Sequence, residues 1–219
     1  MGREIDLLKN YPRTKRNIEE RGATKTDEVR KIARQFGREF FDGERQFGYG
    51  GLKYLPKFWQ PVVPTFEEHF GLNAESSLLD VGCAKGFMMH DFAELIPGIT
   101  VKGIDVSEYA IAHVIEDMQQ HVQLADATNL PFPDKSFDVA ISINTIHNLD
   151  SEGCALALQE IERVSRLGSF ITVDAYRNDE EKERMYSWNL TAKTIMSVDE
   201  WIAFFNKVGY KGDYFWFIP

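Results

Sequence analysis

The sequence is poor in cysteine, since only Cys83 and Cys154 occur among 219 residues. Two cysteines cannot build a disulfide framework, and neither has a partner at the spacing of a paired metal-ligand motif. No other group of histidines, cysteines and carboxylates has the spacing of a metal site. We therefore expect no bound metal, and a reduced, cytoplasmic environment.

Long apolar runs are also missing. No stretch approaches the roughly 18 apolar residues of a membrane-spanning helix, so we expect no membrane insertion. Residues 1–6 lack the apolar core of a secretory signal, and Asp6 stands where a myristoylation motif requires Ser or Thr. With 43% hydrophobic and 27% charged residues, the composition is typical of a globular protein.

Positive charge is scarce overall but concentrated near the N-terminus. The net charge of −9 argues against nucleic acid as a general partner. Residues 1–57 contain 14 Lys and Arg against 9 Asp and Glu, whereas the remainder contains 11 against 25. The basic segment is either a solvated helical face or a surface that attracts an anionic substrate.

The stretch LLDVGCAKGF, residues 78–87, has the pattern of a strand, a tight turn and a helix. An apolar run ends at Val81, Gly82 and Gly86 follow, and residues 87–95 carry apolar side chains at helical spacing. Glycine lets backbone approach a ligand closely, and the helix N-terminus directs free N–H groups at it. We expect the polar end of a ligand to meet backbone here.

Strand-like and helix-like segments alternate from residue 76 onward. Strands are predicted at 77–81, 100–104, 122–125, 137–143, 169–173 and 214–218, and helices at 86–95, 107–118, 152–166 and 198–208. The pattern predicts an α/β fold with a Rossmann-like, doubly wound, mostly parallel sheet and helices on both faces.

Residues 1–71 are expected to form an N-terminal helical arm and lid, ahead of a main domain at 72–219. Residues 1–35 are polar and predict a mobile or loosely packed arm, while 25–41 has helical apolar spacing. Residues 47–54 are rich in glycine and aromatics. They form either a linker that covers the core or a lid that excludes water. A helix over 58–70, closed by Gly71, should pack on the main domain.

Informative polar residues follow successive predicted strands, where open parallel sheets bind ligands. Asp105, 23 residues past Gly82, is placed to accept hydrogen bonds from two ribose hydroxyls. Asp126 can accept a hydrogen bond from the exocyclic amine of an adenine, and the Ala127 N–H can donate one to the same edge of the base. Asn144 lies where the amino-acid end or the reactive group of a cofactor would point.

Together these segments resemble the class I S-adenosylmethionine-dependent methyltransferase family, in its small-molecule branch. The matching pieces occur in order over roughly residues 76–175 and are 79–86, 103–107, 125–127, 130–138 and 160–164. The resemblance implies S-adenosyl-L-methionine as the cofactor. The cofactor-binding residues that we then expect are Asp80, Gly82, Cys83, Ala84, Lys85, Gly86, Asp105, Val106, Ser107, Asp126, Ala127 and Asn144.

The resemblance also implies roles. The glycine turn would line the methionine portion, Asp105 would bind the ribose and Asp126 the adenine, and Asp80 would order the turn instead of catalysing. Three departures stand out. Ala84 replaces a usual third glycine, 167–169 replaces a common Pro-Gly-Gly, and 214–218 leaves room for one strand of a terminal antiparallel pair. Residues 189–196 are the candidate for the second strand.

The acceptor side is less defined. His147 is the candidate general base, because it follows the fourth strand and should face the cleft. The alternatives are a histidine bonded to backbone, or one that contacts the cofactor. The candidate substrate-binding residues are Tyr49, Tyr54, Asp174 and Tyr176.

The combined prediction is a methyltransferase that moves a methyl group from S-adenosyl-L-methionine to a small-molecule acceptor by in-line displacement. The basic residues Arg13, Lys15 and Arg16 favour an anionic or sugar-nucleotide-like acceptor. One alternative is a non-catalytic S-adenosylmethionine-binding regulatory or partner protein. Another is an NAD-linked dehydrogenase, whose three-glycine fingerprint is absent. Whether the chain forms a homodimer is left open.

Overall fold

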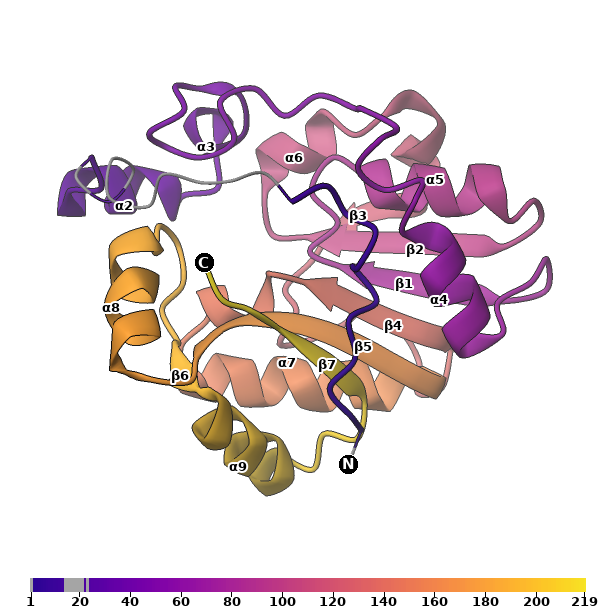
Figure 1. Cartoon of the computed structure of the whole chain (residues 1–219). Coiled ribbons are helices and arrows are strands. Elements are labelled where there is room, and N and C mark those ends of the chain that lie inside the picture. The colour runs from indigo at the N-terminus through magenta and orange to yellow at the C-terminus, as the bar shows by residue number, and fades with distance from the viewer. Residues whose placement is uncertain (1, 14–21, 23) are drawn as a thin grey trace.

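A seven-stranded sheet forms the centre of the computed structural model, which describes residues 2–13, 22 and 24–219 (Figure 1). The strands are β1 (Ser77–Val81), β2 (Thr100–Asp105), β3 (Val122–Leu124), β4 (Phe137–Ile143), β5 (Ser165–Tyr176), β6 (Met196–Ser197) and β7 (Asp213–Phe217). Their order is β3-β2-β1-β4-β5-β6, with β7 also paired to β5, and these pairings are parallel. The predicted α/β, mostly parallel sheet is confirmed.

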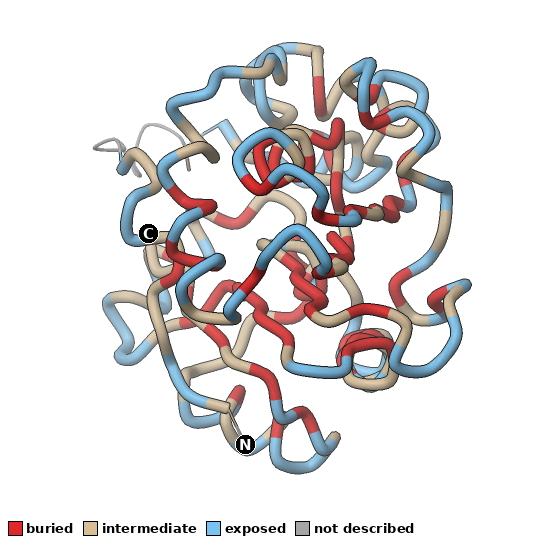
Figure 2. The backbone as a smooth tube through the Cα atoms, turned by 90° about the vertical axis from the view of Figure 1, so that its right-hand side faces the viewer, coloured by how far each residue is buried: buried red, intermediate tan, exposed pale blue. Residues whose placement is uncertain are grey.

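Helices cover both faces of the sheet. The described ones are α2 (Asp27–Ala33), α3 (Arg38–Asp42), α4 (Val63–Phe70), α5 (Phe87–Leu95), α6 (Glu108–Ala112), α7 (Ser151–Val164), α8 (Asp179–Trp188) and α9 (Val198–Val208), with 3-10 turns at Glu116–His121 and Ile146–Asn148. One core lies under α7 and α9, around Leu158 and Trp201, and the other under α4 and α5, around Phe66 and Phe92. In Figure 2 the buried stretches of the chain (red) gather in the interior, and exposed stretches (pale blue) lie around the rim.

Local signals set the ends of several elements as predicted. Ser197 and Glu200 form a reciprocal capping box at the start of α9, and Gly209 ends that helix in the left-handed conformation with φ 80°. Gly71 ends α4 in the same way, with φ 65°. The described helices are all too short or too polar to cross a membrane.

Three helix predictions are corrected. The segment 25–41 forms two helices, α2 and α3. Phe36, with a left-handed φ of 50°, interrupts the helical conformation, and Gly37 is the N-cap from which α3 begins. The helix predicted at 58–70 starts only at Val63, since a helix from residue 58 would place Pro64 in its interior, whereas in α4 Pro64 lies in the first turn, where proline is tolerated. The helix predicted at 107–118 ends at Ala112 and resumes as a 3-10 turn.

The described part of the N-terminal arm is packed, contrary to the predicted loose arm. Leu7 is 3% exposed, and its carbonyl accepts a hydrogen bond from the Thr65 hydroxyl of α4. The backbone of residues 3–5 pairs with the outer edge of β7 at Tyr214. Lys15 and Arg16 lie outside the described residues.

The C-terminal edge of the sheet departs from the expected antiparallel pair. The helix α9 returns the chain so that β7 runs parallel to β5, with Phe170 opposite Asp213 and Asp174 opposite Phe217. Residues 189–196 supply no antiparallel strand; only Met196 contributes to a strand, the two-residue β6, and it pairs with β5 in parallel. In the described part of the chain, the antiparallel strand is missing.

The carboxyl ends of the strands face α2, α3 and α8, which are drawn at the left of Figure 1. Two arginines hold α2 against the loop after α8: Arg30 within the helix donates to the Asn189 carbonyl, and Arg34, its C-cap, donates to the Thr191 and Ala192 carbonyls. The N-terminal segment and the α8 loop thus enclose the strand ends together.

Candidate functional site

The turn after β1 combines three residues in the left-handed conformation, namely Gly82 (φ 91°), Ala84 (φ 49°) and Gly86 (φ 75°). The N–H groups of Gly82 and Cys83 both donate to the Ile104 carbonyl of β2, which fixes the turn to the sheet. A Cβ on Gly82 would stand 2.2 Å from the Thr145 Oγ1 after β4. Glycine at 82 is therefore required both for its φ and for this close approach.

Asp105 at the end of β2 holds the turn from the other side. Its Oδ2 accepts from the Ala84 N–H and its Oδ1 from the Ser107 N–H, each at 2.8 Å. Burial raises the pKa of this carboxyl, and the two backbone N–H groups oppose that rise. Each oxygen keeps a second lone pair, so Asp105 can still accept from two hydroxyls of a ligand.

Asp80 lies beneath the turn and is 5% exposed. Burial and the nearby charge of Asp105 raise the pKa of Asp80 to about 7. An acid in this environment is stabilised in its charged form by any cationic group placed near it.

A cavity of about 1460 Å³ opens between the strand ends and the N-terminal segment. Of the predicted cofactor residues, those that line it are Gly82, Ala84, Asp105, Val106, Asp126, Ala127 and Asn144. Its opposite wall comes mainly from the N-terminal segment, with Phe36, Phe40, Phe41, Tyr49, Phe58 and Trp59. The loop 188–193 after α8 closes one side.

The cavity thus joins a glycine turn, an acid after β2 and an acid after β3. Residues 79–173, which contain all three, match the family model described as "Methyltransferase domain". The chain carries a class I S-adenosylmethionine-dependent methyltransferase domain.

Two curated relatives come from Arabidopsis thaliana. One is a tRNA (carboxymethyluridine(34)-5-O)-methyltransferase, 32% identical over 65% of this chain and 34% of its own length. The other is a cycloartenol-C-24-methyltransferase, 30% identical over 69% of this chain and 48% of its own length. The chain therefore spans about a third to a half of these relatives.

Among solved structures, the [4+2]-cyclase SpnF has the same fold, with a TM-score of 0.56, 23% identity, and coverage of 68% of this chain and 56% of that one. At that identity the likeness concerns the fold alone. The methyl donor of the family to which the matched domain belongs is S-adenosyl-L-methionine. The acceptors named for the relatives differ in chemistry, from tRNA to a sterol precursor.

Other predicted cofactor residues of the methyltransferase domain do not line the cavity. Cys83 is buried against Met89 over Gly103, and burial raises the pKa of its thiol well above the usual range. Ser107 caps α6 through the Ala110 N–H. Asp80 lies in β1 before the turn, and Gly86 ends the turn as the N-cap of α5. Lys85 directs its ammonium group toward Asp42 and the Leu52 carbonyl in the N-terminal segment.

Asp126 uses one of its oxygens within its own turn. Its Oδ1 accepts from both the N–H and the hydroxyl of Thr128 at 2.8 Å. These bonds orient the carboxylate at the exposed rim of the cavity, beside the buried Ala127. The arrangement fits a carboxylate that receives a hydrogen bond from a ligand with its second oxygen.

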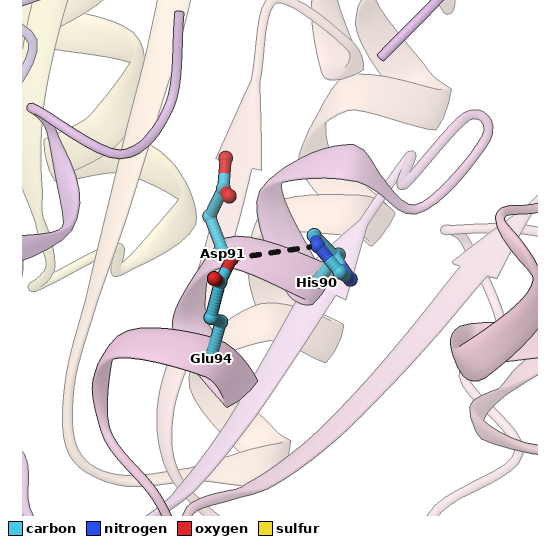
Figure 3. A group of neighbouring side chains, drawn as sticks. All are labelled: His90, Asp91 and Glu94. Carbon is cyan, nitrogen blue, oxygen red and sulfur yellow. Dashed lines mark ion pairs between the residues drawn. The ribbon is translucent and has the colours of Figure 1, made fainter. Parts of the chain in front are cut away.

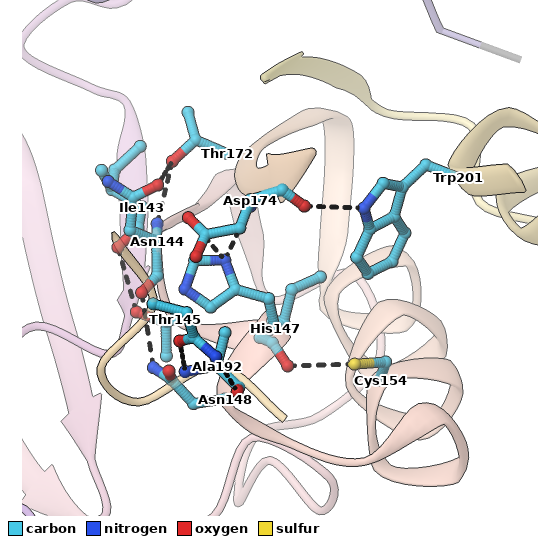
Figure 4. A network of polar contacts seen from close by, with 12 residues as sticks. Ile143, Asn144, Thr145, His147, Asn148, Cys154, Thr172, Asp174, Ala192 and Trp201 are labelled. Atoms are coloured by element: carbon cyan, nitrogen blue, oxygen red, sulfur yellow. Dashed lines mark hydrogen bonds and ion pairs between the residues drawn. The ribbon is translucent and has the colours of Figure 1, made fainter. Parts of the chain in front are cut away.

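A polar network joins the ends of β4 and β5 (Figure 4). Asn144, in the left-handed conformation with φ 52°, donates its N–H to Thr172 Oγ1 and accepts from that hydroxyl through Oδ1. His147 is 4% exposed and accepts the Asp174 N–H at Nδ1, over 2.9 Å. With Nδ1 as acceptor, the proton of the neutral imidazole is at Nε2.

Burial lowers the pKa of His147, while the carboxyl of Asp174 opposes that shift. Asp174 itself is 7% exposed and lines the cavity, and burial raises its pKa. Its Oδ1 lies 3.7 Å from His147 Nδ1. His147 and Asp174 thus form a pair of titratable side chains on the cavity wall, near the carboxyl end of β5.

The aromatic substrate candidates are placed differently from one another. Tyr49 lines the cavity and contacts Phe40 and Phe41. Tyr54 does not line it and donates instead to Asp91 of α5. Tyr176 also lies outside the lining and faces Glu200. Phe36 and Phe40 also line the cavity, and their only signal in the sequence was apolar spacing within 25–41.

A second polar group lies on α5 and consists of His90, Asp91 and Glu94 (Figure 3). One possible ligand atom from each lies within 4.8 Å of the others. His90 is bonded to Asp117 (2.6 Å), Asp91 to Tyr54 (2.5 Å) and Glu94 to Gln60 (3.1 Å). Asp91 and Glu94 thus hold residues 54–60 against α5, and His90 holds the 3-10 turn Glu116–His121 against the same helix.

Proposed function

We propose that the chain is a methyltransferase that moves a methyl group from S-adenosyl-L-methionine to a small-molecule acceptor with an anionic group. The observation that carries the proposal is the cavity. One wall holds the glycine turn with Asp105 and Asp126, and the other holds the aromatics of the N-terminal segment. A cavity of about 1460 Å³ exceeds the roughly 300–1,000 Å³ of a pocket for one ligand, so it has room for donor and acceptor together.

The residues present fit the cofactor. Gly82 and Ala84 place the backbone of the turn on the cavity wall for the methionine end, the spare lone pairs of Asp105 suit ribose hydroxyls, and the second oxygen of Asp126 suits an adenine amine. When bound, S-adenosyl-L-methionine supplies a methyl group that its sulfonium charge already activates. The protein's task is then to orient the acceptor and exclude water.

For an oxygen or carbon acceptor we propose that Asp174 and His147 handle the proton as a pair. His147, first predicted as the base, holds its proton at Nε2 while Nδ1 accepts from backbone. In this tautomer it donates a hydrogen bond to the acceptor. Asp174 lines the cavity with a carboxyl whose pKa is raised by burial, which suits it to receive a proton.

The preference for an anionic acceptor rests on the cations of the cavity wall. Lys53 and Lys193 are exposed and line the cavity. Arg13, by contrast, pairs with Asp6 and does not line it. We therefore assign the anion-attracting role to Lys53 and Lys193. In this proposal the arm and lid, residues 1–71, form the acceptor side of the cavity, where the methyl acceptor binds. The main domain, residues 72–219, forms the donor side, where the methyl donor binds.

The first test is calorimetry with S-adenosyl-L-methionine, S-adenosylhomocysteine and NAD. We expect the two sulfur compounds to bind, and Asp105→Ala to weaken their binding by about 1–3 kcal/mol, as for a lost charged hydrogen bond. Asp134→Ala, at an exposed acid outside the cavity, is the control. Binding of NAD alone would overturn the proposal.

The second test follows labelled methyl transfer to a panel of aromatic carboxylates, phosphates, sterols and total tRNA. We expect transfer to an anionic small molecule, and a raised KM for it in Lys53→Glu and Lys193→Glu but not in the surface control Lys211→Glu. Transfer to tRNA would overturn the small-molecule class. Donor binding without transfer to any acceptor would favour the regulatory alternative.

A further inference from the structure

The ammonium group of Lys85 is turned away from the cavity and into the N-terminal segment. Its Nζ lies 2.8 Å and 2.7 Å from the two carboxylate oxygens of Asp42, and 3.0 Å from the Leu52 carbonyl. The Lys85 side chain is 8% exposed. All three donors of a buried ammonium group are thus directed to residues 42–52.

Asp42 is the centre of this contact. It accepts from the Tyr109 hydroxyl of α6 at 2.8 Å and from the Leu52 N–H at 3.1 Å, in addition to Lys85. Burial raises its pKa, but the hydrogen bonds from Lys85 and Tyr109 outweigh this effect, so the pKa lies below its usual value. The carboxylate therefore stays charged at neutral pH and holds three separate segments together.

The contact connects the two walls of the cavity. Lys85 follows Ala84, which lines the donor side, while Phe41 and Leu52 on either side of the Asp42 contact line the opposite wall. The Phe41 carbonyl also accepts from the Leu52 N–H, so the loop 43–52 closes on Asp42 as a unit. A second link joins the Ser107 hydroxyl to the Phe36 carbonyl.

We propose that Lys85 and Asp42 are positioning residues that latch the N-terminal segment over the donor side of the cavity and set the rate at which the cofactor enters and leaves. The proposal rests on the proposed function, since it takes S-adenosylmethionine as the ligand. Lys85 acts here through Asp42 and not as a ligand to the cofactor. The segment that covers the acceptor is thereby fastened directly to the glycine turn.

The measurement that separates a latch from a ligand is the pair of rate constants for S-adenosylhomocysteine. Loss of a direct contact raises the dissociation rate and weakens the affinity. Loss of a latch raises the association and dissociation rates together. We expect Asp42→Asn and Lys85→Met each to raise both rates by roughly tenfold, the size of one lost charge-assisted hydrogen bond, with less than a twofold change in Kd.

Glu39→Gln is the matched control, because it removes the same charge from the same helix α3 at an exposed position. Tyr109→Phe keeps the Lys85 pair and should raise both rates less. If Lys85→Met does not fold, Asp42→Asn, which keeps the side-chain shape, carries the test.

Unchanged association and dissociation rates in Asp42→Asn would overturn the latch. So would a rise in the dissociation rate alone, with a matching loss of affinity, in Lys85→Met, because that result would make Lys85 a cofactor ligand. Absence of binding to the unaltered chain would instead overturn the proposed function, and the latch with it.

Discussion

The backbone N–H of Asp174 donates a 2.9 Å hydrogen bond to Nδ1 of His147, inside the protein and at the wall of the cavity. An imidazole that accepts at Nδ1 carries its proton at Nε2 when neutral. Nitrogen-detected NMR should therefore find Nδ1 unprotonated and Nε2 protonated at pH 7.5. A proton at Nδ1 would contradict this geometry and return His147 to the role of base.

The buried His147 also predicts a pH dependence. Burial lowers its pKa, whereas an unfolded histidine titrates near 6.5. As pH falls through about 6.5 the unfolded chain takes up a proton that the folded chain does not, so stability contributed by the neutral imidazole is lost. Urea unfolding between pH 8 and 5.5 should show this loss, and His147→Gln should reduce it. The exposed His113→Gln is the control, and equal slopes in both variants would refute the prediction.

Asp80 should act in the opposite direction. Its pKa of about 7 in the fold exceeds the value near 3.9 of an unfolded aspartate. Between these values the unfolded chain alone has lost the proton, so stability falls as pH rises from about 4 to 7. Without ligand, Asp80→Asn should gain on the order of 2–4 kcal/mol at pH 8 and little at pH 4.

Asp138 supplies a control of opposite sign for Asp80. Burial raises its pKa, but hydrogen bonds from Ser77 and the cation of Arg166 bring it below its usual value. Asp138→Asn should therefore lose stability at pH 8. If both asparagine variants change stability in the same direction at pH 8, the assignment for Asp80 is wrong.

Ala84 stands in a left-handed conformation that only glycine adopts without penalty. Ala84→Gly should stabilise the fold by about 0.5–1 kcal/mol, because relief of the strain outweighs the added freedom of the unfolded chain. Ala203→Gly, at an exposed position inside α9, should instead destabilise it by about 1 kcal/mol. Chemical denaturation of both variants makes the comparison, and a loss in both would show that residue 84 is unstrained.

Gly82 and Gly51 separate backbone strain from steric conflict. Both have positive φ, at 91° and 97°, but a Cβ would meet Thr145 only at Gly82 and nothing within 4 Å at Gly51. Gly51→Ala should cost about 1–2 kcal/mol from strain alone. Gly82→Ala should cost at least about 3 kcal/mol and abolish cofactor binding in calorimetry. Similar losses in the two variants would mean that the approach of Thr145 is unimportant.

The donor side of the site could be predicted because its signals are local. A strand, a glycine turn and a helix follow one another within residues 78–95, and Asp105 and Asp126 each come directly after a strand. Parallel strands bring these ends to one edge whatever the rest of the chain does. The capping residues Ser197 and Gly209 are local in the same sense, and both were placed correctly.

The acceptor side depends on contacts between distant residues. Lys85 was assigned to the cofactor because it stands in the turn, yet its partner Asp42 is 43 residues away. Tyr54 was assigned to the substrate, yet its hydroxyl reaches Asp91. The helix α8 was missed because its charged sequence has little apolar periodicity and buries only Met185, although Asn178 and Glu181 offered a capping signal.

The pairing of residues 3–5 with β7 has a consequence for how the molecule behaves in concentrated solution. Open strand edges recruit other strands, and the outer edge of β7, with Phe215 and Phe217, would otherwise offer backbone groups for such pairing. Residues 3–5 occupy that edge at Tyr214 in the same way that a closing strand would. Removal of residues 2–8 would uncover it, and the shortened chain would then self-associate through edge-to-edge strand pairing and lose solubility.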